Sequence, residues 1–177
     1  MPALNEPPHI YIDDKARSRI DALHLPPQFV VFHCSSNANE KEWPREYWNR
    51  LSGYISSTYG YHVVEVGVQK VQPDLGRDWY RNTSGQLKIL ETAEAIRRSE
   101  LFIGIDSGPA HLANGVGVFG IILMGSYLGF STYNPFSGGY GDGSNAVLMR
   151  HRGNVRDLPY DEVEKTLDDV VRRLLVE

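Results

Sequence analysis

The chain has 177 residues, of which 41% are hydrophobic and 23% are charged, and its formal net charge is −4. This length suffices for one well-buried domain and is too short for two full-sized ones. The slightly acidic balance lacks the basic patch typical of nucleic-acid binding, and no apolar run approaches the roughly 18 residues of a transmembrane segment. The N-terminus has no signal-peptide layout, and a single cysteine, Cys34, excludes an internal disulfide framework. We therefore expect a soluble cytoplasmic domain.

The first 28 residues differ in composition from the rest of the chain. Residues 1–28 contain five prolines and one short helical candidate, Asp14 to Leu23, and we interpret them as an N-terminal segment. The folded domain is expected over residues 29–177. It opens with Phe29 to His33, a short apolar and β-branched run that is typical of a strand buried on both faces of a parallel sheet.

Helical and strand patterns then alternate. Residues 44–59 predict a helix, because proline is tolerated in a first helical turn and Gly60 suits a helix end. Residues 62–68 predict a second strand, and Ser84 is a suitable N-cap for a helix over residues 85–99. The remaining predicted elements are a strand over 101–105, a helix over 109–114, a strand over 119–124, a loop over 125–145, a strand over 146–149 and a helix over 160–176. Such alternation is typical of an α/β fold, a Rossmann-like doubly wound parallel sheet.

Residues 102–120 contain two glycine patterns that resemble phosphate sites. One of them, Gly115-Val-Gly117-Val-Phe-Gly120, spells the dinucleotide fingerprint G-x-G-x-x-G. That fingerprint binds pyrophosphate because it follows a strand and opens a helix, whereas this stretch follows a helix and precedes a strand. We therefore interpret it as a helix exit, in which Gly115 or Gly117 adopts a positive φ.

The other pattern, Asp106-Ser107-Gly108-Pro109, lies at the carboxyl end of a predicted buried strand, where open α/β sheets bind ligands. Gly108 permits close approach of a ligand to the backbone, and Pro109 favours a first helical turn whose unpaired N–H groups attract anions. The alternative is that Asp106 or Ser107 only caps the helix. The residue types alone leave both interpretations open.

Three blocks, in order along the chain, resemble a known family. Asp106-Ser-Gly-Pro-Ala-His111-Leu-Ala resembles the D-[ST]-G-x-x-H-x-A signature of family 9 glycosyltransferases, the lipopolysaccharide heptosyltransferases. Residues 29–36, followed by Lys41-Glu-Trp-Pro-Arg-Glu-Tyr-Trp48, are similar to that family's strand, turn and K-x-W-P-x-E-x-[FW] helix start. Gly138-Gly-Tyr-Gly141 resembles a loop of the enzymes that add the first heptose.

The resemblance implies an enzyme with two Rossmann domains, the GT-B arrangement, in which the C-terminal half binds a nucleotide-sugar donor such as ADP-heptose. This chain resembles that half alone. The implied activity is glycosyl transfer in lipopolysaccharide biosynthesis, with a nucleotide-diphosphate sugar as substrate and without a bound metal or other cofactor. An acceptor-binding half from another chain, or a second copy of this chain, is the implied protein partner.

The resemblance also implies the residues of a donor site. Ser107 and Gly108 would hold the diphosphate through hydroxyl and backbone N–H groups, and His111 would line the pocket one turn further along the helix. Ser35 and Ser36 match the position at which the family's first strand turns toward the donor.

Two further residues carry the implied catalytic roles. Lys41 would neutralise charge developing on the leaving diphosphate, and Asp106 would contact the donor sugar or orient Lys41. The family's proposed general base belongs to the N-terminal half, which has no counterpart in this sequence. After the second strand, residues 65–70 match the family's ribose-binding acidic stretch only loosely, which leaves the nucleotide base open.

These observations support three hypotheses. The chain is the donor-binding component of a glycosyltransferase, or a binding module that holds a nucleotide sugar without catalysis, or a degenerate domain whose motifs only pack and cap.

Overall fold

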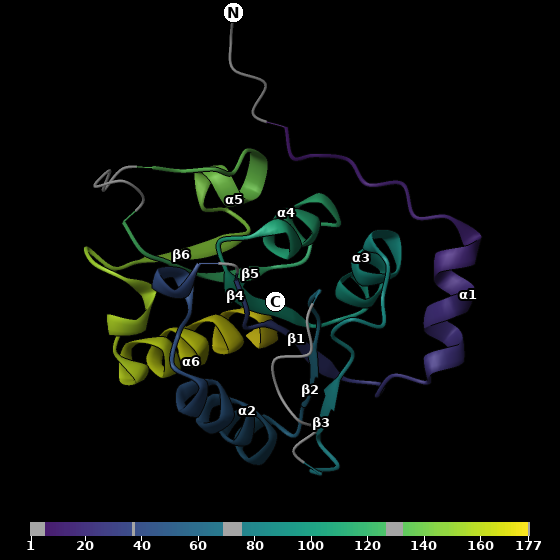
Figure 1. Ribbon diagram of the computed structural model, residues 1–177, viewed down its shortest axis with the longest axis horizontal. Helices are drawn as coiled ribbons and strands as arrows, with labels where there is room; N and C mark the ends of the chain where they lie inside the picture. Colours follow the sequence, from purple (N-terminus) through teal and green to yellow (C-terminus); the bar gives the residue numbers. More distant parts are fainter. Residues whose placement is uncertain (1–5, 37, 69–75, 127–132, 177) are drawn as a thin grey trace, which may run out of the picture.

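A six-stranded parallel sheet forms the centre of the computed structural model, which describes residues 6–36, 38–68, 76–126 and 133–176 (Figure 1). The strand order is β3-β2-β1-β4-β5-β6. The strands are β1 (Phe29–His33), β2 (His62–Glu65), β3 (Tyr80–Asn82), β4 (Leu101–Ile105), β5 (Gly120–Met124) and β6 (Ala146–Arg150). Because the order runs outward in both directions from β1 and β4, this is the doubly wound, Rossmann-like fold that the sequence predicts.

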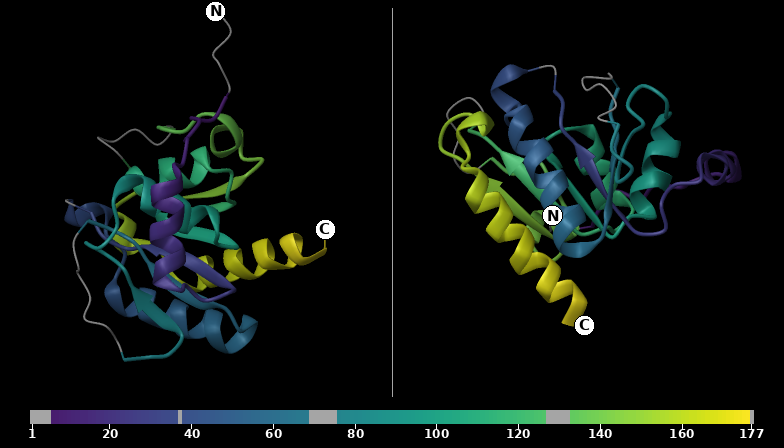
Figure 2. Two further views of the ribbon diagram at one scale, coloured as in Figure 1. Left: turned by 90° about the vertical axis from the view of Figure 1, so that its right-hand side faces the viewer. Right: turned by 90° about the horizontal axis from the view of Figure 1, so that it is seen from below.

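Helices cover both faces of the sheet (Figure 2). They are α1 (Asp14–Leu23), α2 (Arg45–Tyr59), α3 (Ile89–Arg97), α4 (Gly108–Gly115), α5 (Gly138–Asp142) and α6 (Tyr160–Val176), with 3-10 turns η1 (Asn39–Lys41) and η2 (Val155–Asp157). Helices α2 and α6 lie on one face, and α3, α4 and α5 lie on the other. Within the described ranges, no helix is both long and apolar enough to cross a membrane.

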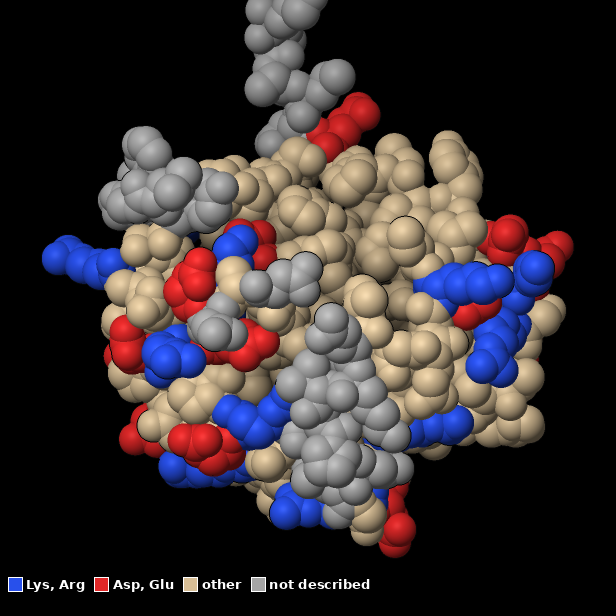
Figure 3. All heavy atoms as spheres, in the orientation of Figure 1, with Lys and Arg blue, Asp and Glu red and all other residues tan. Residues whose placement is uncertain are grey.

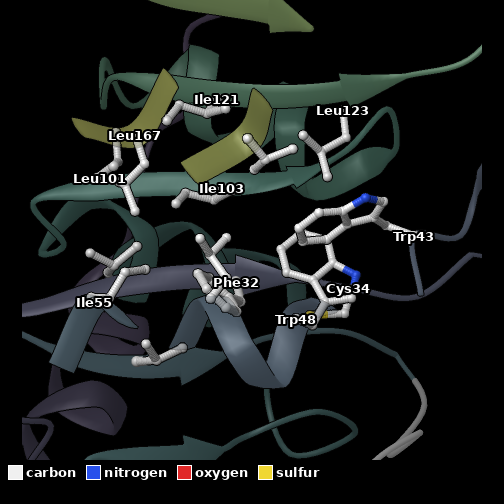
Figure 4. Packing of buried hydrophobic residues seen from close by; sticks show 14 of the residues in the cluster. Phe32, Cys34, Trp43, Trp48, Ile55, Leu101, Ile103, Ile121, Leu123 and Leu167 are labelled. Atoms are coloured by element: carbon white, nitrogen blue, oxygen red, sulfur yellow. The ribbon is translucent and has the colours of Figure 1, made fainter. Parts of the chain in front are cut away.

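The core between the sheet and helices α2 and α6 is aromatic and aliphatic (Figure 4). Trp48 of α2 is fully buried and lies edge-on to Phe32 of β1, with ring centroids 5.0 Å apart. Leu167 of α6 is buried against the same face. Full burial of one such side chain contributes about 1.5–3 kcal/mol to folding, so this layer is a main source of stability.

The opposite face packs closely because its helices carry small residues. Ala110 and Ala113 of α4 are completely buried, which allows the helix to approach the sheet. Tyr140 of α5 is also completely buried, and its hydroxyl donates a hydrogen bond of 2.8 Å to the carbonyl oxygen of Val118.

The predicted helix Asp14–Leu23 is confirmed as α1, whose N-terminus is capped by Asp13. It packs against α3, and Arg98 forms an ion pair with Asp21 at 2.7 Å. Before α1, the chain runs across the C-terminal end of α4. A β-carbon on Gly115 would lie 2.8 Å from the backbone carbonyl oxygen of Pro8, so this crossing requires glycine.

The helix exit predicted after residue 114 is also confirmed. Gly117 has a φ of 76°, in the left-handed region that favours glycine. The G-x-G-x-x-G stretch therefore leads from α4 into β5.

The largest differences from the prediction are two missed elements and two shifted boundaries. Strand β3 was not predicted, β2 ends at Glu65 instead of Val68, and the predicted loop 125–145 contains α5. Helix α3 begins at Ile89 and not at Gly85, which has a φ of 76° and donates its N–H to the carbonyl oxygen of Gly67 at 2.8 Å. A residue in that conformation cannot start an α-helix.

We predict that Gly104→Ala destabilises the protein. An added β-carbon would lie 2.7 Å from Phe102 Cζ and 3.2 Å from His33 Cβ, inside the packed sheet. Such overpacking costs about 1–3 kcal/mol, which chemical denaturation measures.

The matched control is Gly53→Ala in α2. Its new methyl group would meet Trp79 at 3.8 Å, an ordinary contact, and alanine is the better helix former by about 0.5–1 kcal/mol. Equal effects of the two substitutions would contradict the packing argument.

Candidate functional site

A pocket of about 350 Å³ lies at the carboxyl ends of β1, β2 and β4. It is lined by His33, Ser35, Ser36, Lys41, Val68, Asp106, Ser107, Gly108 and Pro109. Ligands of doubly wound sheets bind at this edge, where the strand order reverses. The structure thus brings together all the predicted site residues except His111.

The ion pair between Lys41 and Asp106 joins the two halves of this site. Lys41 ends η1 in the connection after β1, whereas Asp106 directly follows β4. Lys41 Nζ lies 3.8 Å from Asp106 Oδ2, and the two side chains are 33% and 15% exposed. Both residues also line a second pocket of about 190 Å³, which continues toward Leu123 and Val155. The pair therefore lies at the junction of two pockets.

The N-terminus of α4 faces the larger pocket without a side-chain cap. Ser107 is the N-cap residue, but its hydroxyl donates to the carbonyl oxygen of Ile105 at 3.3 Å and makes no capping bond. Asp106 is paired with Lys41. No atom lies within 4 Å of a β-carbon built on Gly108, so the backbone is open at this point. The positive end of the helix dipole is consequently directed at the pocket.

Ser35 and Ser36 form the turn after β1. Ser36 donates its backbone N–H to Glu42 Oε1 at 3.1 Å, and its side-chain oxygen accepts the N–H of Ala38 at 3.1 Å. The Ser36 hydroxyl proton therefore stays available as a donor. Ser35 Oγ lies 3.4 Å from a β-carbon built on Gly67, beside the end of β2. The turn supplies hydroxyl donors to the pocket.

His111 does not line this pocket. Its ring packs against Phe136, with centroids 4.7 Å apart, on the side of α4 that faces the segment before α5. The signature histidine thus contacts an aromatic side chain here, while its implied role near a donor stays a prediction.

His33 lines the pocket, although the sequence analysis did not place it in the site. The side chain is 5% exposed, and Nδ1 lies 2.9 Å from the carbonyl oxygen of Val66. Burial lowers the pKa of His33, against an opposing effect of the Val66 and Ser35 backbone groups. Its position as the last residue of a predicted strand was the available signal, because that position faces the ligand edge.

Glu65 ends β2 on the α2 side of the sheet and does not line the pocket. Tyr80 donates its hydroxyl to Glu65 Oε2, and Asn82 Nδ2 lies 3.4 Å from the same oxygen. Burial raises the pKa of Glu65. The loose match to a ribose-binding stretch therefore starts with a buried carboxyl group, while residues 69 and 70 lie outside the described residues.

The pocket is not surrounded by a large surface of one charge. On the face shown in Figure 3, basic and acidic side chains are interspersed and form no large region of one sign. Within the described part of the chain, no group of three or more His, Cys, Asp or Glu side chains is arranged to hold a metal ion. The positive charge on the pocket comes from Lys41 and the end of α4.

The sequence matches the family model described as glycosyltransferase family 9 (heptosyltransferase) over residues 2–165. The chain belongs to glycosyltransferase family 9. The family that the three sequence blocks resemble is thus confirmed. No curated protein matches the chain significantly.

Solved structures share the fold of this family 9 chain. A family 9 glycosyltransferase from Veillonella parvula superposes with a TM-score of 0.74 at 22% identity, over 96% of this chain and 54% of that one. The ADP-heptose lipopolysaccharide heptosyltransferase II of E. coli gives 0.70 at 17% identity, over 93% and 54%. An E. coli heptosyltransferase solved with ADP gives 0.62 at 15% identity, over 85% and 46%. The chain spans about half the length of these proteins.

We predict that Ser107→Ala leaves the free energy of unfolding nearly unchanged, because the Ser107 side chain makes no capping bond. The matched control is Asp13→Ala in α1, which removes a capping bond of 2.7 Å to the N–H of Ala16. Loss of such a cap costs about 1 kcal/mol, measurable by chemical denaturation. A larger loss for Ser107→Ala than for Asp13→Ala would favour the capping interpretation of this serine.

Proposed function

We propose that this family 9 chain binds a nucleoside diphosphate sugar, of which ADP-heptose is the representative donor, and contributes the donor half of a glycosyl transfer. One observation carries the proposal. A lysine and an uncapped helix N-terminus, from segments far apart in the sequence, meet on one pocket at the carboxyl edge of the sheet. We further propose that the transfer serves lipopolysaccharide assembly in the cytoplasm.

The pocket suits a diphosphate because its donors come from three directions. Gly108 offers an open backbone at the start of α4, beside the Ser107 hydroxyl. Ser36 offers its hydroxyl from the turn after β1, and Lys41 adds the formal positive charge. Charge-assisted hydrogen bonds of this kind are about twice as strong as neutral ones.

The same groups favour departure of the diphosphate. In the transfer, the bond between the sugar's anomeric carbon and the phosphate oxygen breaks, and negative charge grows on the leaving group. Lys41 and the α4 dipole, already directed at the pocket, stabilise that charge without reorganisation. Asp106 holds Lys41 in place and faces the second pocket, where the sugar is proposed to lie. No metal ion is required in this scheme.

Removal of the acceptor's proton needs a base beside the acceptor, and the family resemblance assigns that role to a carboxylate of the acceptor-binding half. Asp106 is the carboxylate that lines the larger pocket, and its charge is engaged by Lys41. We therefore propose that a separate acceptor-binding half, on another chain, carries this base. The same observation favours a second candidate function, a binding module that holds the nucleotide sugar without catalysis.

Titration calorimetry with ADP, UDP and GDP tests the binding step. We expect saturable binding of at least one of them, and at least a tenfold loss of affinity in Lys41→Ala, because a charge-assisted bond contributes about 1.5–3 kcal/mol. Lys165→Ala, which removes an exposed lysine of α6, is the matched control and should bind as the wild type does. Absence of binding by any nucleoside diphosphate at millimolar concentration would remove the proposal.

A transfer assay separates the enzyme component from the binding module. We expect no transfer from ADP-heptose by the isolated chain, and transfer when the acceptor-binding half is added. This activity should be lost in Lys41→Ala and retained in a metal chelator, because the positive charge comes from the protein. If the chain binds the nucleotide sugar but transfers no sugar with any acceptor-binding half encoded beside this gene, the non-catalytic binding module is favoured.

A further inference from the structure

The imidazole of His33 is held in a slot built by two glycines. His33 is the last residue of β1, and its backbone lies between Gly104 of β4 and the end of β2. A β-carbon on Gly104 would lie 3.2 Å from His33 Cβ, and one on Gly67 would lie 3.5 Å from His33 Nδ1. A β-carbon on Gly104 would therefore crowd His33 Cβ, whereas one on Gly67 would meet the ring at an ordinary contact distance. The hydrogen bond to Val66 holds the side chain at the edge of the pocket.

The hydrogen bond to Val66 determines which ring nitrogen carries the proton. A carbonyl oxygen accepts only, so Nδ1 must donate its hydrogen in the 2.9 Å contact. In the neutral imidazole, Nε2 then carries a lone pair and acts as an acceptor. The geometric hydrogen bond described for the ring is the one at Nδ1, a backbone group of Ser35 also acts on the ring, and Nε2 is not among the buried polar atoms that lack a partner. The ring therefore presents an acceptor to the pocket that it lines.

This acceptor is chemically distinct from its neighbours. Lys41 and the Ser36 hydroxyl group supply donors, and Asp106, the other strong acceptor, is paired with Lys41. A phosphate oxygen is itself an acceptor and gains nothing from a neutral imidazole lone pair. A sugar hydroxyl is a donor, and it is the part of a nucleotide sugar that fits this nitrogen.

We infer that His33 is a specificity-determining residue, which accepts a hydrogen bond at Nε2 from a sugar hydroxyl of the bound nucleotide sugar. The inference rests on the proposed function and adds to it. The hydroxyl belongs to the ribose or to the transferred sugar. ADP carries only the ribose and ADP-glucose carries both, so the two ligands distinguish these cases. Inorganic pyrophosphate is bound by the surrounding donors alone. A diphosphate that carries a sugar gains the additional hydrogen bond to His33.

Two substitutions separate the two ring nitrogens. In His33→Asn the amide occupies the place of Nδ1, so the bond to Val66 is retained and the pocket acceptor is lost. In His33→Gln the amide reaches the place of Nε2, so an acceptor returns to the pocket while the Val66 bond is lost. We expect the affinity for the nucleotide to decrease in the order wild type, Gln, Asn. The melting temperature should instead decrease in the order wild type, Asn, Gln.

Calorimetry with three ligands then tests the inference. For pyrophosphate, His33→Asn should bind as the wild type does. For ADP, a loss of about fivefold to twentyfold in affinity assigns the hydroxyl to the ribose. A loss seen with ADP-glucose and not with ADP assigns it to the transferred sugar. His62→Asn, the same substitution at the amino end of the neighbouring strand, is the matched control and should change no affinity.

Three results would overturn the inference. Equal weakening of pyrophosphate and ADP in His33→Asn would assign His33 to the phosphates or to general packing. Unchanged affinity for every ligand, with wild-type binding intact, would remove His33 from the site and leave the proposed function standing. Failure of the wild type to bind ADP-glucose or any of ADP, UDP and GDP would contradict the inference and the proposed function together.

Discussion

The parallel pairing of β1 with β4 is the constraint on which the rest of this structure depends. The two strands lie side by side although about 70 residues separate them, with His33 opposite Gly104 at their carboxyl ends. From this pair, the chain continues to α2 on one face and to α4 on the other, so no helix closes the edge between them. The connections after β1 and β4 therefore meet over an opening, and Lys41 reaches Asp106 there.

The packing of Trp43 in the core, beneath the carboxyl edge of the sheet, determines where Lys41 lies. Trp43, two residues later, is buried and donates its indole N–H to the carbonyl oxygen of Leu158 at 2.9 Å. Its ring also stacks parallel to Tyr160 and lies edge-on to Trp48. The tryptophan of the lysine motif thus anchors the chain between η1 and α2 to the core, and the lysine is positioned by a buried residue that lines neither pocket.

The proposed ligand, a nucleotide sugar, has parts of different chemistry, and so does the lining of the pocket. Its positive charge and open helix N-terminus suit a diphosphate, whereas the neutral acceptor of His33 suits a hydroxyl. The second pocket, beyond the Lys41–Asp106 pair, continues the opening toward β5 and η2. Family membership, the fold and this arrangement agree with one another, and substrate identity is the next step for experiment.

Sequence by itself determined the parallel α/β fold and a helix exit at Gly115 or Gly117, since apolar runs and glycine positions are local signals, and the family resemblance implied that Lys41 lies near Asp106. It missed β3 and α5, which are short and depend on neighbours such as Val63 and Val118 for their hydrogen bonds. Only the tertiary structure decided that His33 faces the pocket and that His111 packs on Phe136. The direction of a side chain at the end of an element depends on the glycines and aromatic rings that other strands and helices place beside it.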